Sequence, residues 1–403
     1  MTRSITDQAH DFYDAVPYEV PVPDTSLYEL LDTAARLYPD RVALDYFGAT
    51  TTYAQVRDQV LRAARVLHEA GVGPGDTVAI ALPNCPQAFV AFYACMRIGA
   101  VAAQHNPLAP AAEVAGQLER HGGRVAIVWE KCVDAFPLDR LDTVFTVDIS
   151  RAMPASQRFL LSLPAPRARD MRAQLRGPVP AGAVSWDRAT ASSRAIDAEH
   201  PLPSPDDRAV ILHTSGTNGV PKSAPLTHRN IGVNVNQCLF WVWKLHEGAE
   251  TFFSLLPYFH AFGLTFFLCA AVRKAATQVL LPKFDAQMAL DAHARRPVTF
   301  FVGVPPMFER PHRRGLRPIR NRARPDGRSP VRQAPPRRAR RPLPLHAAAT
   351  RLPGGRHAGR RGRPARRDHR ARTTGLWRVP QRARGNRARL HLRGLVQDRR
   401  HRR

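Results

Sequence analysis

The chain has 403 residues, of which 44% are hydrophobic, enough for two or three domains with a sizeable core. Its net charge of +27 is concentrated at one end, because residues 311–403 hold 31 Arg and three Asp without any Lys or Glu, a net +28. Subtracting these from the totals of 60 and 33 leaves residues 1–310 with 29 basic and 30 acidic side chains, which excludes a uniformly basic protein.

Cysteine usage and the N-terminus both favour a cytoplasmic protein. The five cysteines are odd in number and show no CxxC spacing, so neither a disulfide framework nor a zinc site is indicated. The first twenty residues lack the basic-then-apolar order of a signal peptide. We therefore expect a chain that stays in a reducing cytosol.

Between Thr52 and Val302, apolar β-type runs alternate with amphipathic stretches. This alternation predicts an α/β fold with a parallel sheet covered by helices on both faces. Residues 151–200, rich in Pro, Ala and Arg, are expected to form a surface excursion. Strands are expected at 77–82, 100–104, 124–129, 209–213, 251–256, 277–281 and 298–302, and helices at 86–99, at 111–122, from about 227 and from about 285.

One stretch, residues 251–272, is uncharged and about as long as a membrane span. Pro257, His260 and Gly263 interrupt it, and such breaks are typical of a strand, a loop and a helix in succession. We therefore favour a buried strand, loop and helix over a transmembrane helix.

The stretch "HTSGTNGVPKSAPLTHRN", residues 213–230, follows a predicted strand and precedes a predicted helix. Hydroxyl side chains, glycines that let the backbone approach a ligand, and an ammonium group can together cradle a polyphosphate. The stretch does not match the GxxxxGK[ST] loop, and a flexible Gly/Ser turn would use similar residues. The candidate phosphate-binding residues are Thr214, Ser215, Gly216, Thr217, Gly219 and Lys222.

This stretch resembles the phosphate-binding signature of the adenylate-forming superfamily, usually TSGTTGxPK, with Asn218 where Thr is commoner. The superfamily includes acyl-CoA synthetases, luciferases and peptide-synthetase adenylation domains. Residues 52–110, "LPYFHAFG" at 256–263 and "FVGVPPMF" at 301–308 resemble further family segments in the same order. The resemblance implies the large N-terminal AMP-binding domain of such an enzyme over residues 1–310.

The resemblance also implies a reaction. ATP and a carboxylic acid give an acyl-adenylate and pyrophosphate, CoA then displaces AMP, and Mg²⁺ assists. The six candidate residues would hold the β- and γ-phosphates, with Lys222 and His260 as catalytic residues. His260 would border the acyl pocket, although a histidine beside aromatic residues is often a core residue. "NPLAP" and the start of the excursion look most like long-chain fatty acid–CoA ligases.

The family pattern stops near residue 310. A YGxTE-type loop for adenine and Mg²⁺, a TGD whose Asp binds ribose, and a C-terminal lid domain with a catalytic Lys are all missing from the sequence as written. The metal ligands are therefore unknown, and we expect the chain to be inactive.

The missing elements reappear in another reading frame. Read one base later, degenerate codons for 310–322 permit VPIVEGYGxSET, and those for 393–403 permit xGWFKTGDIA. A deletion near Glu309 whose length is not divisible by three would remove a segment and shift the frame together, whereas a one-base slip would only shift the frame. We therefore predict an out-of-frame, disordered tail over 311–403.

Two alternatives remain. The tail could make the chain a non-specific binder of nucleic acid or anionic membrane, with peripheral membrane contact, because any such charge attracts phosphates. Evolved RNA-binding tails usually mix Lys, Gly, Ser or aromatics, whereas this one has no Lys and one aromatic, Trp377. Alternatively, a truncated domain could still bind ATP weakly, with exposed strand edges that favour aggregation.

Overall fold

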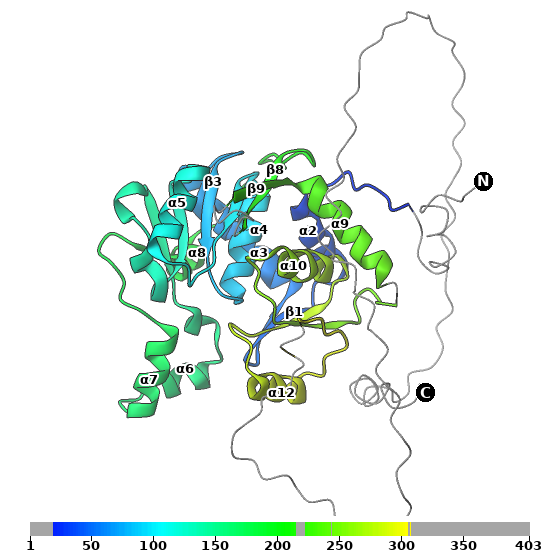
Figure 1. Cartoon of the computed structure of the whole chain (residues 1–403). Helices are drawn as coiled ribbons and strands as arrows, with labels where there is room; N and C mark the ends of the chain where they lie inside the picture. Colours follow the sequence, from blue (N-terminus) through cyan, green and yellow to red (C-terminus); the bar gives the residue numbers. More distant parts are fainter. Residues whose placement is uncertain (1–18, 215–221, 243, 305–306, 308–403) are drawn as a thin grey trace, which may run out of the picture. The chain divides into compact units, whose positions relative to one another are not determined.

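The computed structural model describes residues 19–214, 222–242, 244–304 and 307, all of which belong to one compact unit. The predicted out-of-frame tail lies outside the described residues. Within them, two sheets and their helices form an α/β arrangement (Figure 1), as the sequence predicts.

The larger sheet has seven strands in the order β7-β6-β5-β3-β4-β8-β9. All neighbouring pairs are parallel except β8 and β9, which are antiparallel. The strands are β3 (Thr77–Ala81), β4 (Val101–Gln104), β5 (Val125–Trp129), β6 (Thr143–Val147), β7 (Val184–Ser185), β8 (Arg208–Thr214) and β9 (Lys222–Thr227).

Helices cover both faces of this sheet, which confirms the prediction. Along β3 the side chains alternate between two apolar clusters: Val78 and Ile80 join the main core, whereas Ala79 and Ala81 join a second cluster on the other face. The main core contains α2 (Leu27–Leu37), α3 (Tyr53–Glu69) and α4 (Pro86–Ile98), and the second contains α5 (Ala111–His121) and the 3₁₀ turn η1 (Glu130–Ala135). Such alternation is what a sheet buried on both sides requires.

The smaller sheet has four strands in the order β10-β11-β1-β2. β1 (Val42–Tyr46) and β2 (Ala49–Thr52) form an antiparallel hairpin, and β11 (Thr277–Leu280) pairs in parallel with both β1 and β10 (Thr251–Ser254). The strand expected at 298–302 is reduced to one parallel bridge, Phe252 to Phe300. Thr299 N and Phe300 N both donate to Thr251 O, so the regular ladder does not form there.

The uncharged stretch 251–272 is a strand, a loop and a helix, as predicted. After β10 and the loop, a continuous helical segment runs through α10 (Ala261–Gly263), a π-helical part, η4 (Leu264–Ala270), and α11 (Ala271–Arg273). α9 (His228–Trp241) and α12 (Ala286–Arg295) match the other two expected helices. Nowhere in the described ranges is a helix both long and apolar enough to cross a membrane.

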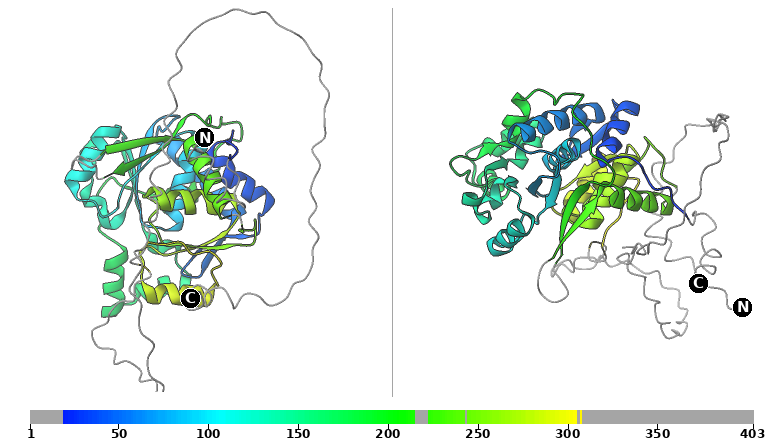
Figure 2. Two further views of the ribbon diagram at one scale, coloured as in Figure 1. Left: turned by 45° about the vertical axis from the view of Figure 1, so that its right-hand side comes forward. Right: turned by 90° about the horizontal axis from the view of Figure 1, so that it is seen from above.

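Residues 151–200 combine protruding and buried parts. α6 (Ala155–Ser162) and α7 (Pro166–Leu175) form a helical hairpin at the margin of the unit, visible from two further directions in Figure 2. β7 then adds an edge strand, and α8 (Trp186–Ser192) buries Trp186 in the main core. The remaining 3₁₀ turns are η2 (Leu138–Arg140) and η3 (Ile149–Ala152).

Candidate functional site

The ends of β8 and β9 bring two of the six predicted phosphate-binding residues together. Thr214 ends β8, Lys222 begins β9, and the two are direct partners in the antiparallel register. Directly opposed residues project to the same side of a sheet. Both residues are exposed, so a hydroxyl and an ammonium group flank the base of the 215–221 segment. Ser215, Gly216, Thr217 and Gly219 lie outside the described residues.

The next residue pair adds a side-chain contact between these two strands. His213 is the partner of Ser223, and its Nδ1 lies 3.1 Å from the Ser223 hydroxyl oxygen. Side chains alternate along a strand, so His213 points to the opposite face from Thr214. The sequence did not single out His213 as a site residue, although it is the first residue of the quoted stretch 213–230.

On that face three imidazoles meet, and we call His105, His121 and His213 the histidine cluster. His105 follows β4, His121 ends α5 and His213 lies on β8. The His105 and His213 rings are 4.8 Å apart between centroids, and the His105 and His121 Nε2 atoms are 3.0 Å apart. One nitrogen from each ring lies within 4.8 Å of the others.

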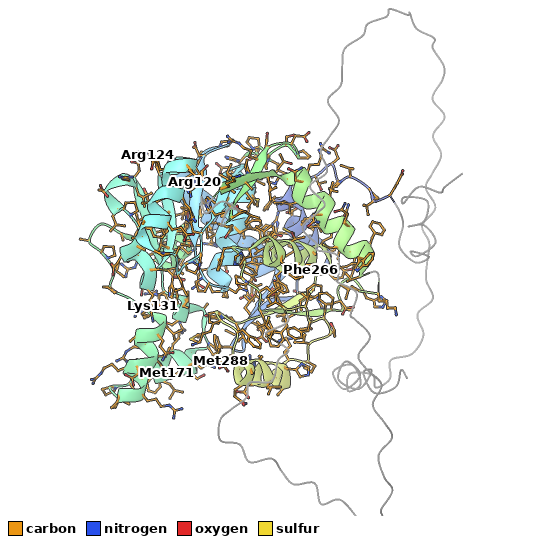
Figure 3. All side chains as sticks on the ribbon, viewed as in Figure 1. Arg120, Arg124, Lys131, Met171, Phe266 and Met288 are labelled. Carbon is orange, nitrogen blue, oxygen red and sulfur yellow. The ribbon has the colours of Figure 1, made fainter. Side chains whose placement is uncertain are left out.

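Burial keeps the histidine cluster neutral. Loss of solvent lowers the pKa of His105 well below its usual value and lowers the pKa of both His121 and His213 to about 4. The charge of Arg120, labelled in Figure 3, lowers all three pKa values further. At pH 7 each ring therefore has one N–H and one lone pair.

The hydrogen bonds assign the tautomers. The Gly123 N–H donates to Nδ1 of His121 over 3.0 Å, so the proton of neutral His121 resides on Nε2. That proton is donated to Nε2 of His105, which places the His105 proton on Nδ1. A histidine that binds a metal normally donates its other ring N–H. Because Gly123 is itself a donor to His121, this pattern fits a hydrogen-bonded pair of His105 and His121 better than a metal centre.

Mg²⁺ prefers oxygen ligands, and carboxylates above all. Within the described ranges the histidine cluster is the one group of three or more His, Cys, Asp or Glu residues close enough to share an ion. Its nitrogen donors do not suit Mg²⁺. Among the described residues, therefore, no group of three or more such side chains suits Mg²⁺.

His260, the predicted acyl-pocket residue, lies at the start of a helix that follows β10 of the smaller sheet. It directly precedes α10, its N–H donates to Pro257 O over 3.2 Å, and its ring centroid is 4.7 Å from that of Phe259. Partial burial lowers its pKa, so the ring is neutral at pH 7. The residue is exposed, so it is not a core histidine. Among the described contacts, none joins His260 to Thr214 or Lys222.

Asn84 is a further residue of this region that sequence reasoning missed. It is buried after β3, and its amide donates to Ser254 O over 3.1 Å and to Leu256 O over 2.8 Å. Its side-chain oxygen accepts from Tyr258 N over 2.9 Å. Asn84 thus fixes the backbone that leads from β10 to His260. A polar residue between an apolar strand and an apolar helix was the available signal.

The chain matches a known family. The family model of the AMP-binding enzyme matches residues 31–345. The match extends past residue 310, the boundary expected from the sequence motifs.

Two relatives illustrate the range of named activities. The long-chain-fatty-acid–CoA ligase of Bacillus subtilis (strain 168) is 28% identical over 309 residues, which cover 74% of this chain and 53% of that protein. The 4-coumarate–CoA ligase-like 9 of Oryza sativa subsp. japonica is 30% identical over 313 residues, which cover 75% of this chain and 50% of that protein. The chain thus spans about half the length of these relatives.

Solved structures agree on the fold. A long-chain-fatty-acid-CoA ligase from Archaeoglobus fulgidus aligns with a TM-score of 0.57 at 22% identity, covering 72% of this chain and 55% of that one. At this identity the likeness shows the fold alone. It is the fold of the N-terminal domain that the sequence predicts.

Proposed function

Because the chain belongs to the AMP-binding enzyme family, we propose that its described residues form the nucleotide- and acyl-binding part of a fatty acid–CoA ligase. The observation that carries the nucleotide part is the direct pairing of Thr214 with Lys222 at the ends of β8 and β9. A hydroxyl and an ammonium on one side of a strand pair suit the β- and γ-phosphates of ATP. We assign Ser215, Gly216, Thr217 and Gly219 to the same phosphates from the sequence motif.

The proposed first step is an attack by the substrate carboxylate on the α-phosphorus of ATP. One carboxylate oxygen forms the new P–O bond, the bond to the bridging oxygen of the β-phosphate breaks, and pyrophosphate leaves with that electron pair. A carboxylic acid is already ionised at pH 7, so the step needs no enzymic base. Lys222 would offset the charge that develops on the leaving pyrophosphate, and Thr214 would donate a hydrogen bond to it.

We place His260 beside the acyl chain. The ring is exposed and neutral, with Phe259 packed against it, and Asn84 holds the backbone that precedes it. A neutral imidazole among aromatic rings can line an apolar chain without leaving an unpaired charge there. We propose a long-chain fatty acid as the substrate, supported by the Bacillus subtilis relative and by the "NPLAP" segment. An aromatic acid, as in the name of the rice relative, is the runner-up.

We further propose that this chain binds ATP without completing thioester formation. The family elements for Mg²⁺, ribose and the catalytic lid are not matched in residues 1–310. CoA is the second substrate that the family would use, and we assign no residue to it. The out-of-frame origin of residues 311–403 stays a prediction.

Titration of the full-length chain with ATP tests the proposal. Lys222→Ala should weaken ATP binding about tenfold, the loss of one charge-assisted contact worth roughly 1.4 kcal/mol. Lys283→Ala is the matched control, because Lys283 is an exposed lysine that follows β11 in the other sheet. Titrations in high salt suppress ATP adsorption to the Arg-rich segment. Equal ATP affinities for the two variants would show that Lys222 does not bind the phosphates of ATP.

A further inference from the structure

The α6–α7 hairpin exposes three large apolar side chains. Phe159 is 66% exposed, Leu160 57% and Met171 48%. Single exposed apolar residues are normal on protein surfaces, but these three lie on one short hairpin. Figure 3 labels Met171 on this hairpin, away from the two sheets.

The hairpin is held in place, so its exposed side chains are not the result of a loose segment. The Arg172 guanidinium on α7 donates to Leu161 O and Leu163 O, the free carbonyls at the end of α6. At the other end of α7, the Trp129 indole N–H donates to Leu175 O over 2.8 Å. Leu161 itself is buried in the main core. The exposed apolar residues are therefore presented on a fixed support.

Positive charge accompanies these apolar residues. Residues 155–176 contain five Arg and one Asp, a net +4. Arg158, Arg167 and Arg169 are exposed, and no ion pair within the described part of the chain involves their guanidinium groups. Arg176, in contrast, is committed to Glu130 and Asp148, each at 3.1 Å.

Exposed apolar side chains flanked by uncommitted arginines are the composition of a surface that enters a lipid interface and binds lipid phosphates. We propose that the α6–α7 hairpin docks on an anionic membrane surface, with Phe159, Leu160 and Met171 entering the interface and the three free arginines binding phosphate headgroups. Charge decides against a second copy of this chain, because two hairpins of net +4 repel each other. The same positive charge favours an anionic lipid surface over an uncharged apolar groove of a partner protein.

An environment-sensitive dye on a single cysteine separates hairpin docking from adsorption by the Arg-rich segment. All five natural cysteines are buried, so an introduced surface cysteine is labelled selectively. Ala165→Cys places the dye in the turn between α6 and α7, and Ala112→Cys is the matched control on α5, since both alanines are exposed. The probe is vesicles of phosphatidylglycerol and phosphatidylcholine in 0.5 M NaCl, which weakens purely electrostatic adsorption.

The dye at Ala165→Cys should shift to the blue with anionic vesicles, and the dye at Ala112→Cys should not. Adding Phe159→Ser and Leu160→Ser should raise the lipid concentration at half-maximal shift about tenfold, with unchanged circular dichroism. An equal shift at both positions would mean adsorption through residues 311–403 and would overturn the proposal, as would no shift at Ala165→Cys. A blue shift that occurs without vesicles and grows with protein concentration would overturn the proposal by showing that a second copy of the chain covers the hairpin. Docking requires no nucleotide, so failure here leaves the ATP proposal standing.

Discussion

Replacing Gly263 by alanine should destabilise the chain strongly, although alanine normally favours a helix. A Cβ at this position would lie 2.0 Å from Pro257 O and 2.8 Å from Leu256 O, where ordinary contact begins at 3.4 Å. Neither carbonyl can move freely, because Pro257 O accepts from His260 N and Leu256 O accepts from Asn84. The substitution should therefore distort the turn that carries His260.

The magnitude follows from two opposing effects. Overpacking of this kind costs about 1–3 kcal/mol or more, and a Gly→Ala change within a helix contributes up to about 1 kcal/mol of stability. Gly116→Ala on α5 isolates the second effect, because its new Cβ would meet only the flexible end of Arg120 at 3.3 Å. The helix gain is common to both variants and cancels, so we expect them to differ by the overpacking cost of about 1–3 kcal/mol, with Gly263→Ala the less stable.

Urea unfolding of the full-length variants, followed by circular dichroism, measures this difference. ATP titration of Gly263→Ala adds a second readout. Thr214 and Lys222 lie on the larger sheet, so the affinity of the variant for ATP should be unchanged. If Gly263→Ala were as stable as Gly116→Ala, the steric account of the Pro257–Gly263 turn would be wrong.

Three further predictions concern buried groups. Asn84→Ala should lower the free energy of unfolding by about 2–4 kcal/mol in urea titrations, because it removes three buried hydrogen bonds. A loss under about 1 kcal/mol would mean that water replaces the amide. The histidine cluster has folded pKa values below the unfolded value of about 6.5, so the unfolded chain binds more protons and stability should fall as pH drops from about 6.5 to about 4. In His213→Gln that slope should be shallower, and an unchanged slope would exclude a contribution from His213. Burial raises the pKa of Cys85 to about 12 and also raises the pKa of the other four thiols. A thiol reagent at pH 8 should therefore modify all five cysteines only after denaturation. Rapid reaction of any thiol in the folded protein would contradict this packing.

The sequence predicted several of the parallel strands because their signal is local, but it did not single out β1, β2 or β6. The apolar runs at 77–82, 100–104 and 124–129 appear as β3, β4 and β5 with ends shifted by one residue at most. β9 was missed as a strand because it contains Pro225, which a sheet tolerates at its edge, where β9 lies. β7 has only two residues and carries no periodic signal.

The candidate site was predictable only where its residues are close in sequence. Thr214 and Lys222 belong to one motif, and the structure places them opposite each other. The histidine cluster joins residues from three elements, and Asn84 bonds to carbonyls about 170 residues away, so neither could follow from spacing. Those contacts depend on strand order, which local patterns do not encode.

The position of β11 between β1 and β10 has a consequence for synthesis of the chain on the ribosome. The Thr277 hydroxyl donates to Val42 O across 235 residues of sequence, and the smaller sheet cannot close until both have left the ribosome. At about 5–20 residues per second, that interval is roughly 10–50 s. Throughout this time the β1–β2 hairpin lacks its central neighbour, so chaperones that bind nascent chains have a defined window in which to hold it.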